Sequence, residues 1–372
     1  MTHYVHLRHL LHAFSAIMRR LPSFLPQCSP AFPSALAGLV VLAVVLVGCG
    51  GSSVDSVSID GSSTVFPLTE AVAEEFMEDS QGARVNVGVS GTGGGFSKFL
   101  RGETAINDAS RPIAPNEIEK AEANGIEFIE IPVAYDGLAV VVHPENDWAS
   151  CLTAGELREI WKPDSSIDRW GQIRDSYPDR PIKLYGPGTA SGTYDYFTEA
   201  IVGEAEASRS DFTASEDDNV LVQGITGTET ALGYFGLAYY ENNADKLKAL
   251  SIDPDERDGG APCVTPGAET VKNGRYRPLS RPLFIYVNPA KITPTVEKFV
   301  TFYLQNADEL ASDVGYVAMP DDAYELALQR FQDRTSGTVF GAEGVDATGT
   351  QVEEMLREAA EGTAPSDTVA AE

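Results

Sequence analysis

Serine, threonine and glycine residues gather in the stretch 186–203, which reads GPGTASGTYDYFTEAIVG. Ser191, Gly192 and Thr193 lie where an amphipathic helix is expected to begin. Serine and threonine cap helices because their oxygens accept hydrogen bonds from the first free backbone N–H groups, and glycine lets a ligand approach the backbone closely. Those N–H groups and the positive end of the helix dipole favour an anion. A single loop of this kind is more often an ordinary helix cap.

The chain repeats this loop–helix arrangement twice more. One copy precedes a helix expected over 67–78, whose apolar side chains recur at helical spacing. The other is a glycine run, 91–95, before a short helix expected over 96–101. The polar and glycine residues that these two copies contribute include Ser62, Ser63, Thr64, Thr92 and Gly93. The glycine run fits neither the dinucleotide fingerprint nor a P-loop, and alone it would be read as a flexible loop.

Two charged residues stand where they could act on a bound anion. Arg111 follows an expected strand end, and a planar guanidinium donates two parallel hydrogen bonds to an oxyanion. Asp136 lies inside a long apolar strand expected over 130–143, where a carboxylate is costly unless it is paired or functional. The alternative interpretation of Arg111 is an ordinary surface arginine.

The elements that position these residues alternate as strand, loop and helix, which predicts an α/β fold with ligands at the carboxyl ends of strands. Two long strands far apart in the sequence, at 130–143 and 282–287, predict two lobes joined by two crossing strands with a cleft between them. The expected lobes are 55–136 plus 286–340, and 137–285. The segment 341–372 is expected to be a flexible acidic tail.

The first 48 residues read as a leader. Arg19 and Arg20 precede an apolar run, 35–47, that ends in Leu-Val-Gly before Cys49, the pattern of a secretory signal. Leu-Val-Gly-Cys resembles a bacterial lipobox. This predicts a lipidated Cys49 followed by a short tether, 49–54, with an uncleaved anchor helix as the alternative. Translation from Met18 in place of Met1 is equally compatible with this pattern.

Composition narrows the function of the remaining chain. The net charge of −28, from 27 Lys and Arg against 55 Asp and Glu, argues against nucleic acid and is typical of a solvated acidic surface. One histidine, His143, follows the leader, so histidine metal sites and Ser-His-Asp catalysis are disfavoured. No cofactor or metal is expected. Cys151 and Cys263 remain as a pair, which in an exported chain predicts a disulfide, with two free thiols as the alternative.

Five motifs together resemble the PstS family, the periplasmic phosphate-binding lipoproteins of the phosphate ABC transporter. They are GSSTVFP (61–67), SGTGGGF (90–96), ASRP (109–112), YDG (135–137) and GPGTASGTYDYF (186–197). The resemblance spans 55 to about 335. It implies a type II periplasmic-binding-protein fold that closes over one phosphate, a monomer, and ABC permease subunits as partners. It also implies that the serine, threonine and glycine residues of the three loops bind the phosphate.

The sequence departs from the family pattern at two positions. Pro187 stands where well-known members have an arginine, and Arg111 stands where they have an aspartate after Ala-Ser. We expect Arg111 to supply the displaced guanidinium. The missing aspartate normally accepts the proton of hydrogen phosphate and so rejects sulfate. Asp136 is the expected replacement, with Asp108 as the second candidate.

Three other functions stay open at this level. A binding protein for another tetrahedral oxyanion, such as sulfate, molybdate or arsenate, would share the loops. An exported hydrolase would use Ser191 with His143 as its base, but the Gly-x-Ser-x-Gly signature is absent. A phosphate sensor or surface protein without a transporter would use the same fold.

Overall fold

The structure is a computed structural model that describes residues 56–80, 82–254, 262–341 and 351–362. The expected leader, the tether and Cys49 lie outside these residues. Within the described ranges no helix has the length and apolar character needed to span a membrane.

A mixed sheet forms the centre of the described chain. Its strand order is β2-β1-β3-β11-β4-β8-β6-β7, with β9 also paired to β4. The long strands are β4 (Ile129–Val142) and β11 (Ser280–Val287). The others are β1 (Ser56–Gly61), β2 (Arg84–Val89), β3 (Ile106–Ala109), β6 (Lys183–Gly186), β7 (Thr213–Ala214), β8 (Ala231–Gly236) and β9 (Lys248–Ala249). A separate ribbon pairs β5 (Cys151–Thr153) with β10 (Ser251–Asp253).

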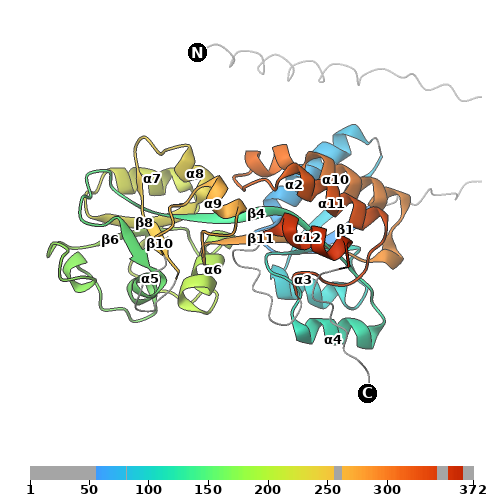
Figure 1. Cartoon of the computed structure of the whole chain (residues 1–372), viewed down its shortest axis with the longest axis horizontal. Coiled ribbons are helices and arrows are strands. Elements are labelled where there is room, and N and C mark those ends of the chain that lie inside the picture. Colours follow the sequence, from blue (N-terminus) through green and yellow to red (C-terminus); the bar gives the residue numbers. More distant parts are fainter. Residues whose placement is uncertain (1–55, 81, 255–261, 342–350, 363–372) are drawn as a thin grey trace, which may run out of the picture. The chain divides into compact units, whose positions relative to one another are not determined.

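Strands β4 and β11 connect two groups of helices (Figure 1). They pair antiparallel from Gly137↔Ser280 to Ile129↔Val287, and every residue in both is buried. The second half of β4 pairs with β8 and β9. The two predicted crossing strands are therefore confirmed. Strand β4 continues without a break through Asp136 and Gly137.

The first group of helices packs with β1, β2 and β3. It comprises α2 (Phe66–Asp79), α3 (Gly91–Phe99), α4 (Pro115–Asn124), α10 (Pro294–Asp313), α11 (Asp321–Gln332) and α12 (Val352–Ala360). Helix α2 has Pro67 in its first turn, which suits a helix start because the missing N–H of proline would have no partner there. Its buried stripe includes Leu68, Val72 and Phe76, as its apolar spacing predicted.

Helix α3 differs from its prediction. We expected a loop over 91–95 and a helix from 96, but the helix starts at Gly91, so the glycine run is helical. Close packing explains the glycines: a Cβ at Gly95 would lie 2.1 Å from Asn107 Oδ1 and 2.5 Å from Gly61 Cα. A run of glycine therefore brings α3 against the ends of β1 and β3.

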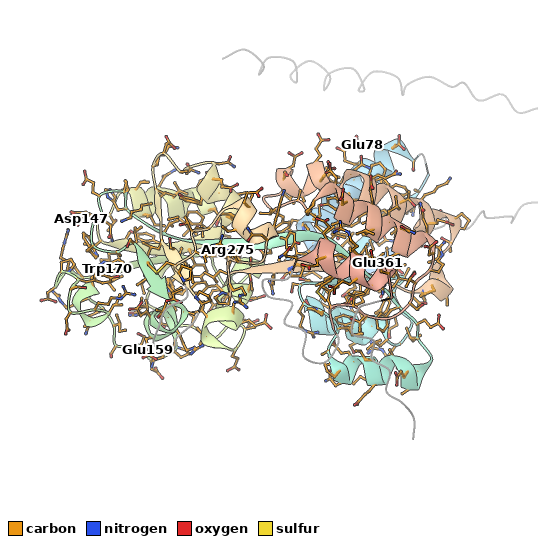
Figure 2. All side chains as sticks on the ribbon, viewed as in Figure 1. Glu78, Asp147, Glu159, Trp170, Arg275 and Glu361 are labelled. Atoms are coloured by element: carbon orange, nitrogen blue, oxygen red, sulfur yellow. A yellow bond between two sulfur atoms is a disulfide. The ribbon has the colours of Figure 1, made fainter. Side chains whose placement is uncertain are left out.

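The second group of helices surrounds β6, β7 and β8. It comprises α5 (Ala154–Trp161), η2 (Trp170–Gln172), α6 (Gly192–Phe197), the π-helix η3 (Thr198–Val202), α7 (Asp218–Thr226), α8 (Leu237–Glu241) and α9 (Ala268–Lys272); the short η4 (Pro289–Lys291) follows β11. Trp170, labelled in Figure 2, is fully buried and packs edge-on against Trp148 and Tyr177. The predicted disulfide between Cys151 and Cys263 is confirmed.

Residues 351–362, within the carboxyl-terminal segment, are more ordered than expected. We predicted a flexible acidic tail over 341–372, but α12 buries Val352 and Leu356 against the first group of helices. The N–H of Val352 donates to the hydroxyl of Tyr135 on β4 at 3.1 Å. The two buried side chains lie four residues apart and so on one face of the helix. This apolar spacing is the sequence signal that would have predicted a packed helix in place of a flexible tail.

Candidate functional site

A pocket of about 190 Å³ lies where the ends of β1, β3 and β11 meet α3 and α6. Five predicted residues line it: Ser62, Ser63, Thr64, Thr92 and Arg111. Six others line it too: Gly91, Ser110, Asp195, Glu199, Ala205 and Arg281. The pocket therefore brings together hydroxyl donors, two guanidinium groups and two carboxylates.

The first wall is the turn between β1 and α2. The N–H of Ser62 donates to the carbonyl of Asp108 at 3.0 Å, and its hydroxyl accepts from the N–H of Thr64 at 3.1 Å. Gly61 has a φ of +152°, and a Cβ there would meet Asp108 O at 2.1 Å. Glycine is therefore needed for this turn to approach β3. The turn holds Ser62 and Thr64 in nearly buried positions.

The second wall joins the first turn of α3 to the end of β3. The hydroxyls of Thr92 and Ser110 lie 3.0 Å apart, and the N–H of Ser110 donates to Thr92 Oγ1 at 3.2 Å. Ser110 was not predicted as a site residue, although it immediately precedes Arg111 in the same motif. The two hydroxyls form a linked pair of donors facing the pocket.

The third loop touches the first. Thr64 Oγ1 lies 3.5 Å from the carbonyl oxygen of Gly192, and a Cβ on Gly192 would meet Thr64 Oγ1 at 2.6 Å. The Ser191 hydroxyl accepts from the N–H of Thr193 at 3.2 Å, which is a helix cap. Ser191, Gly192 and Thr193 thus adjoin the first wall, but they are not among the residues that line the pocket.

Arg111 lines the pocket with its guanidinium already paired. Two parallel hydrogen bonds of 2.8 and 3.0 Å run from it to the carboxylate of Glu117 on α4. The same carboxylate accepts from the N–H of Ala114 at 2.8 Å and so also caps α4. The side chain of Glu117 is only 10% exposed. This partner is therefore fixed, and it holds the guanidinium of Arg111 beside the start of α4.

Arg281 lines the pocket and is not among the residues predicted from the sequence. It is the second residue of β11, pairs with Asp136 in the strand register, and is buried. Its Nη2 donates to Thr64 Oγ1 at 3.3 Å, and its guanidinium lies 3.6 Å above the Tyr196 ring. Asp136 Oδ2 lies 3.5 Å from Nε and Glu199 Oε2 lies 3.5 Å from Nη1. An arginine at the start of an apolar crossing strand was the available signal.

The two aspartates predicted to accept the proton of hydrogen phosphate do not lie on the pocket surface. Asp136 faces Arg281 and Asp108 lies beneath Ser62; neither lines the pocket. Burial raises the pKa of Asp136, and Arg281 opposes that shift. Burial raises the pKa of Asp108 to about 8. Asp195 does line the pocket, and its Oδ1 is buried without a hydrogen-bond partner among the described residues.

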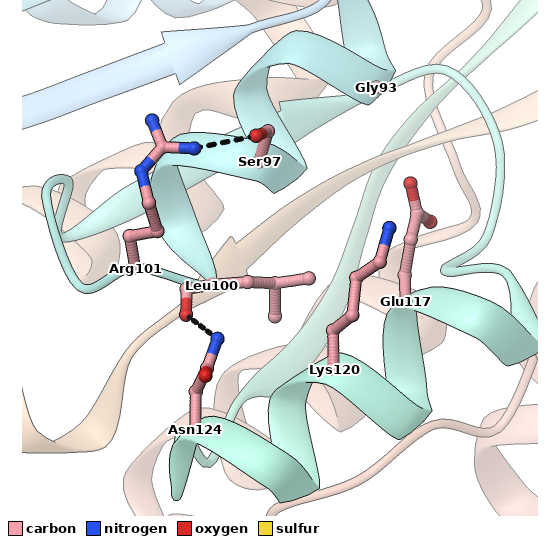
Figure 3. Close-up of a pocket in the computed structure, with 7 residues that line it drawn as sticks. All are labelled: Gly93, Ser97, Leu100, Arg101, Glu117, Lys120 and Asn124. Carbon is pink, nitrogen blue, oxygen red and sulfur yellow. Dashed lines mark hydrogen bonds between the residues drawn. The ribbon is translucent and has the colours of Figure 1, made fainter.

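Gly93, a predicted backbone donor, lines a second pocket of about 230 Å³ between α3 and α4 (Figure 3). That pocket includes Glu117 and Lys120, and a Cβ on Gly93 would lie 4.0 Å from Arg111 Nη2. Gly93 therefore lies behind Arg111. Within the described ranges, no cluster of three or more histidine, cysteine or acidic side chains is arranged to hold a metal.

Comparison with known proteins identifies the class to which this fold belongs. A family model described as a PBP superfamily domain matches residues 50–307, so the chain belongs to the PBP superfamily. Within that class, it is 48% identical to protein SphX of Synechocystis sp. over 83% of this chain and 93% of SphX. It is 36% identical to the phosphate-binding protein PstS of Staphylococcus saprophyticus over 78% of this chain and 91% of that protein. The chain therefore belongs to the PstS family.

A solved structure agrees with this assignment. The crystal structure of a possible phosphate binding protein from Planctomyces limnophilus is 47% identical to this chain, with a TM-score of 0.72. The match covers 76% of this chain and 99% of that one. The predicted family and the predicted two-lobed α/β fold are both confirmed.

Proposed function

We propose that the chain binds inorganic phosphate in the pocket around Arg281 and delivers it to the permease subunits of an ABC importer. The observation that carries this proposal is the contact of Arg281 with Thr64, within a pocket that Ser62, Ser63 and Thr92 also line. Hydroxyl donors and a guanidinium are the groups that tetrahedral oxyanions prefer. The family relationship supports the same ligand.

The proposed site combines two sources of donors. Ser62, Ser63, Thr64 and Thr92 would supply hydroxyl and backbone N–H donors, while Arg281 and Arg111 supply charge. Gly93, Ser191, Gly192 and Thr193 keep the role that the family resemblance implies for them, as backbone or side-chain donors. Ser191 and Gly192 would reach the ligand by small movements, since Gly192 already contacts Thr64. Buried donors of this kind are insulated from the −28 net charge of the chain.

Binding without catalysis is part of the proposal. A hydrolase would need Ser191 activated by His143. The His143 ring instead accepts from the N–H of Glu145 at 3.1 Å, and the Ser191 hydroxyl accepts from Thr193. Neither side chain is paired with the other.

We further propose that the chain is exported, is lipidated at Cys49 and acts as a monomer. The leader pattern and the family support this proposal.

Selectivity against sulfate is proposed to come from a carboxylate that accepts the proton of hydrogen phosphate. Asp136 and Asp108 remain predictions for this role, but Asp195 is better placed because it lines the pocket with an unpartnered oxygen. Burial, with Glu206 nearby, raises the pKa of Asp195. A sulfate ion has no proton to donate to the Asp195 carboxylate, so a sulfate oxygen would face that carboxylate without a hydrogen bond.

Titration calorimetry of the exported chain, residues 49–372, tests the proposal. Phosphate should bind at one site, and sulfate should bind weaker by roughly 100-fold or more. Because the Arg281 guanidinium is buried, the affinity should change little between low and high salt. The variants Asp195→Asn, Asp136→Asn and Asp108→Asn should be compared. The proton acceptor is the aspartate whose replacement most reduces the ratio of the phosphate affinity to the sulfate affinity. Absence of phosphate binding at any salt concentration would overturn the proposed function.

A further inference from the structure

Arg281 contacts two carboxylates that differ in freedom. The Asp136 side chain is 3% exposed and the Glu199 side chain is 51% exposed, yet each lies 3.5 Å from a guanidinium nitrogen. Asp136 pairs with Arg281 in the strand register, so both backbones are fixed. Withdrawal of Asp136 would leave a buried charge without a partner, which is strongly destabilising. Asp136 is therefore a permanent counter-ion of Arg281.

Glu199 is held far less tightly. It lies on the π-helix η3, where its backbone carbonyl accepts from the N–H of Gly203 at 3.1 Å. That hydrogen bond fixes the backbone and leaves the half-exposed side chain free to turn toward water. Ion pairs with an exposed partner contribute little, because water solvates the carboxylate nearly as well. Rotation of Glu199 away from Arg281 therefore costs little.

Negative charge at this end of the pocket is crowded. Glu199 and Asp195 lie one helical turn apart, and both line the pocket beside Arg281. Burial and the charge of Glu206 raise the pKa of Asp195, and Arg281 lowers it. Glu199 also raises this pKa, by a smaller amount. An incoming anion meets these carboxylates at the same guanidinium, and like charges at close range repel.

We propose that Glu199 is an internal competitor for the anion site: its carboxylate and a tetrahedral oxyanion occupy the same face of Arg281 in turn. This inference rests on the proposed function and deepens it. Glu199 lowers the affinity for every oxyanion, whether or not the oxyanion carries a proton, and it speeds release by offering Arg281 a replacement partner. Glu199 thus acts through charge, whereas Asp195 would act through hydrogen bonding to the ligand.

The test is calorimetry and stopped-flow dissociation with inorganic phosphate and with sulfate, on the chain 49–372. Glu199→Gln should bind both anions about three- to fivefold more tightly and release phosphate correspondingly more slowly. The matched control is Glu204→Gln, which removes the same charge from an exposed residue nearby that does not line the pocket. The control should match the wild type. Glu199→Asp, with a shorter reach, should fall between Glu199→Gln and the wild type.

A double-mutant cycle isolates the contact. In an Arg281→Gln background, Glu199→Gln should no longer tighten binding. Thermal unfolding would show whether the Arg281→Gln background folds. If it does not fold, the inference is tested by the predicted order of phosphate affinity alone: Glu199→Gln tightest, then Glu199→Asp, then the wild type. Equal or weaker affinity in Glu199→Gln, or the same gain in Glu204→Gln, would overturn the inference. A wild-type chain that binds no phosphate would overturn the proposed function instead, so the two failures are distinguishable.

Discussion

The two arginines that line the pocket differ in how their charge is held. Arg111 makes a bidentate pair at 2.8 and 3.0 Å with Glu117, whose carboxylate also caps α4. Arg281 has two contacts at 3.5 Å, one of them to the half-exposed Glu199. A carboxylate with three hydrogen bonds is costly to displace, whereas one with a single long contact is not. A guanidinium that lines a pocket is therefore available to a ligand only when its existing carboxylate partner is weakly held.

The largest effect should come from replacing each arginine in turn. Arg281→Gln should weaken phosphate binding by roughly 100-fold or more, because it removes the available charge. It should also lower the free energy of unfolding by about 3–5 kcal/mol, because Asp136 stays buried without a partner. Arg111→Gln should weaken phosphate binding by only about tenfold. Calorimetry and denaturant unfolding measure both. A larger loss of affinity in Arg111→Gln would reverse the comparison.

The two buried aspartates extend this comparison, because Asp136 faces Arg281 while Asp108 faces no cation among its described contacts. Burial raises the pKa of Asp108 to about 8, so the folded protein retains a proton that the unfolded chain releases above about pH 4. The stability tied to this proton is complete below the unfolded pKa. It is lost as pH rises toward 8, by up to about 1.4 kcal/mol per pH unit.

Asp108→Asn should therefore lose less stability than the wild type between pH 5 and pH 8, as denaturant unfolding at several pH values would measure. Asp79→Asn, which removes the same charge from an exposed position on α2, is the matched control. The control should follow the wild-type slope. Identical slopes in all three proteins would mean that Asp108 is not protonated in the fold.

The smallest effect should come from Glu117. Glu117→Gln keeps the shape of the side chain and its bond to Ala114, but it weakens the pair with Arg111. The free energy of unfolding should fall by about 1 kcal/mol, and the affinity for phosphate should change by less than about twofold. Thermal unfolding and calorimetry check this. If Glu117→Gln tightens phosphate binding as strongly as Glu199→Gln, then Arg111 is as available as Arg281.

The fold was largely predictable from sequence because its signals are local or repetitive. Apolar runs predicted β4 and β11, helical spacing predicted α2, and a leftover cysteine pair predicted the disulfide between Cys151 and Cys263. The glycine run of α3 was misread because glycine disfavours isolated helices. Its reason lies in tertiary packing against Asn107 and Gly61, which no local pattern reveals.

The sequence predicted some of the residues that line the pocket. Those it did not predict depend on contacts between residues far apart in the sequence. Ser62, Ser63 and Thr64 were found because they precede the start of α2, and Thr92 was found because it lies at the start of α3. Arg281 lies 217 positions from Thr64 in the sequence, and only the pairing of β11 with β4 brings it to Asp136. The pairing of Arg111 with Glu117 was likewise invisible, although Glu117 is six residues away. Charge can be counted from a sequence, but its availability depends on partners that folding supplies.

The most direct test of this account is a crystal structure of the chain 49–372 with phosphate bound. The account predicts a phosphate within hydrogen-bond distance of the Arg281 guanidinium and of donors from Ser62–Thr64 and Thr92. Asp136 should remain beside Arg281, and the Glu199 carboxylate should have turned toward solvent. A phosphate bound away from Arg281, or one bound there with Glu199 still in contact with the same guanidinium nitrogen, would contradict it.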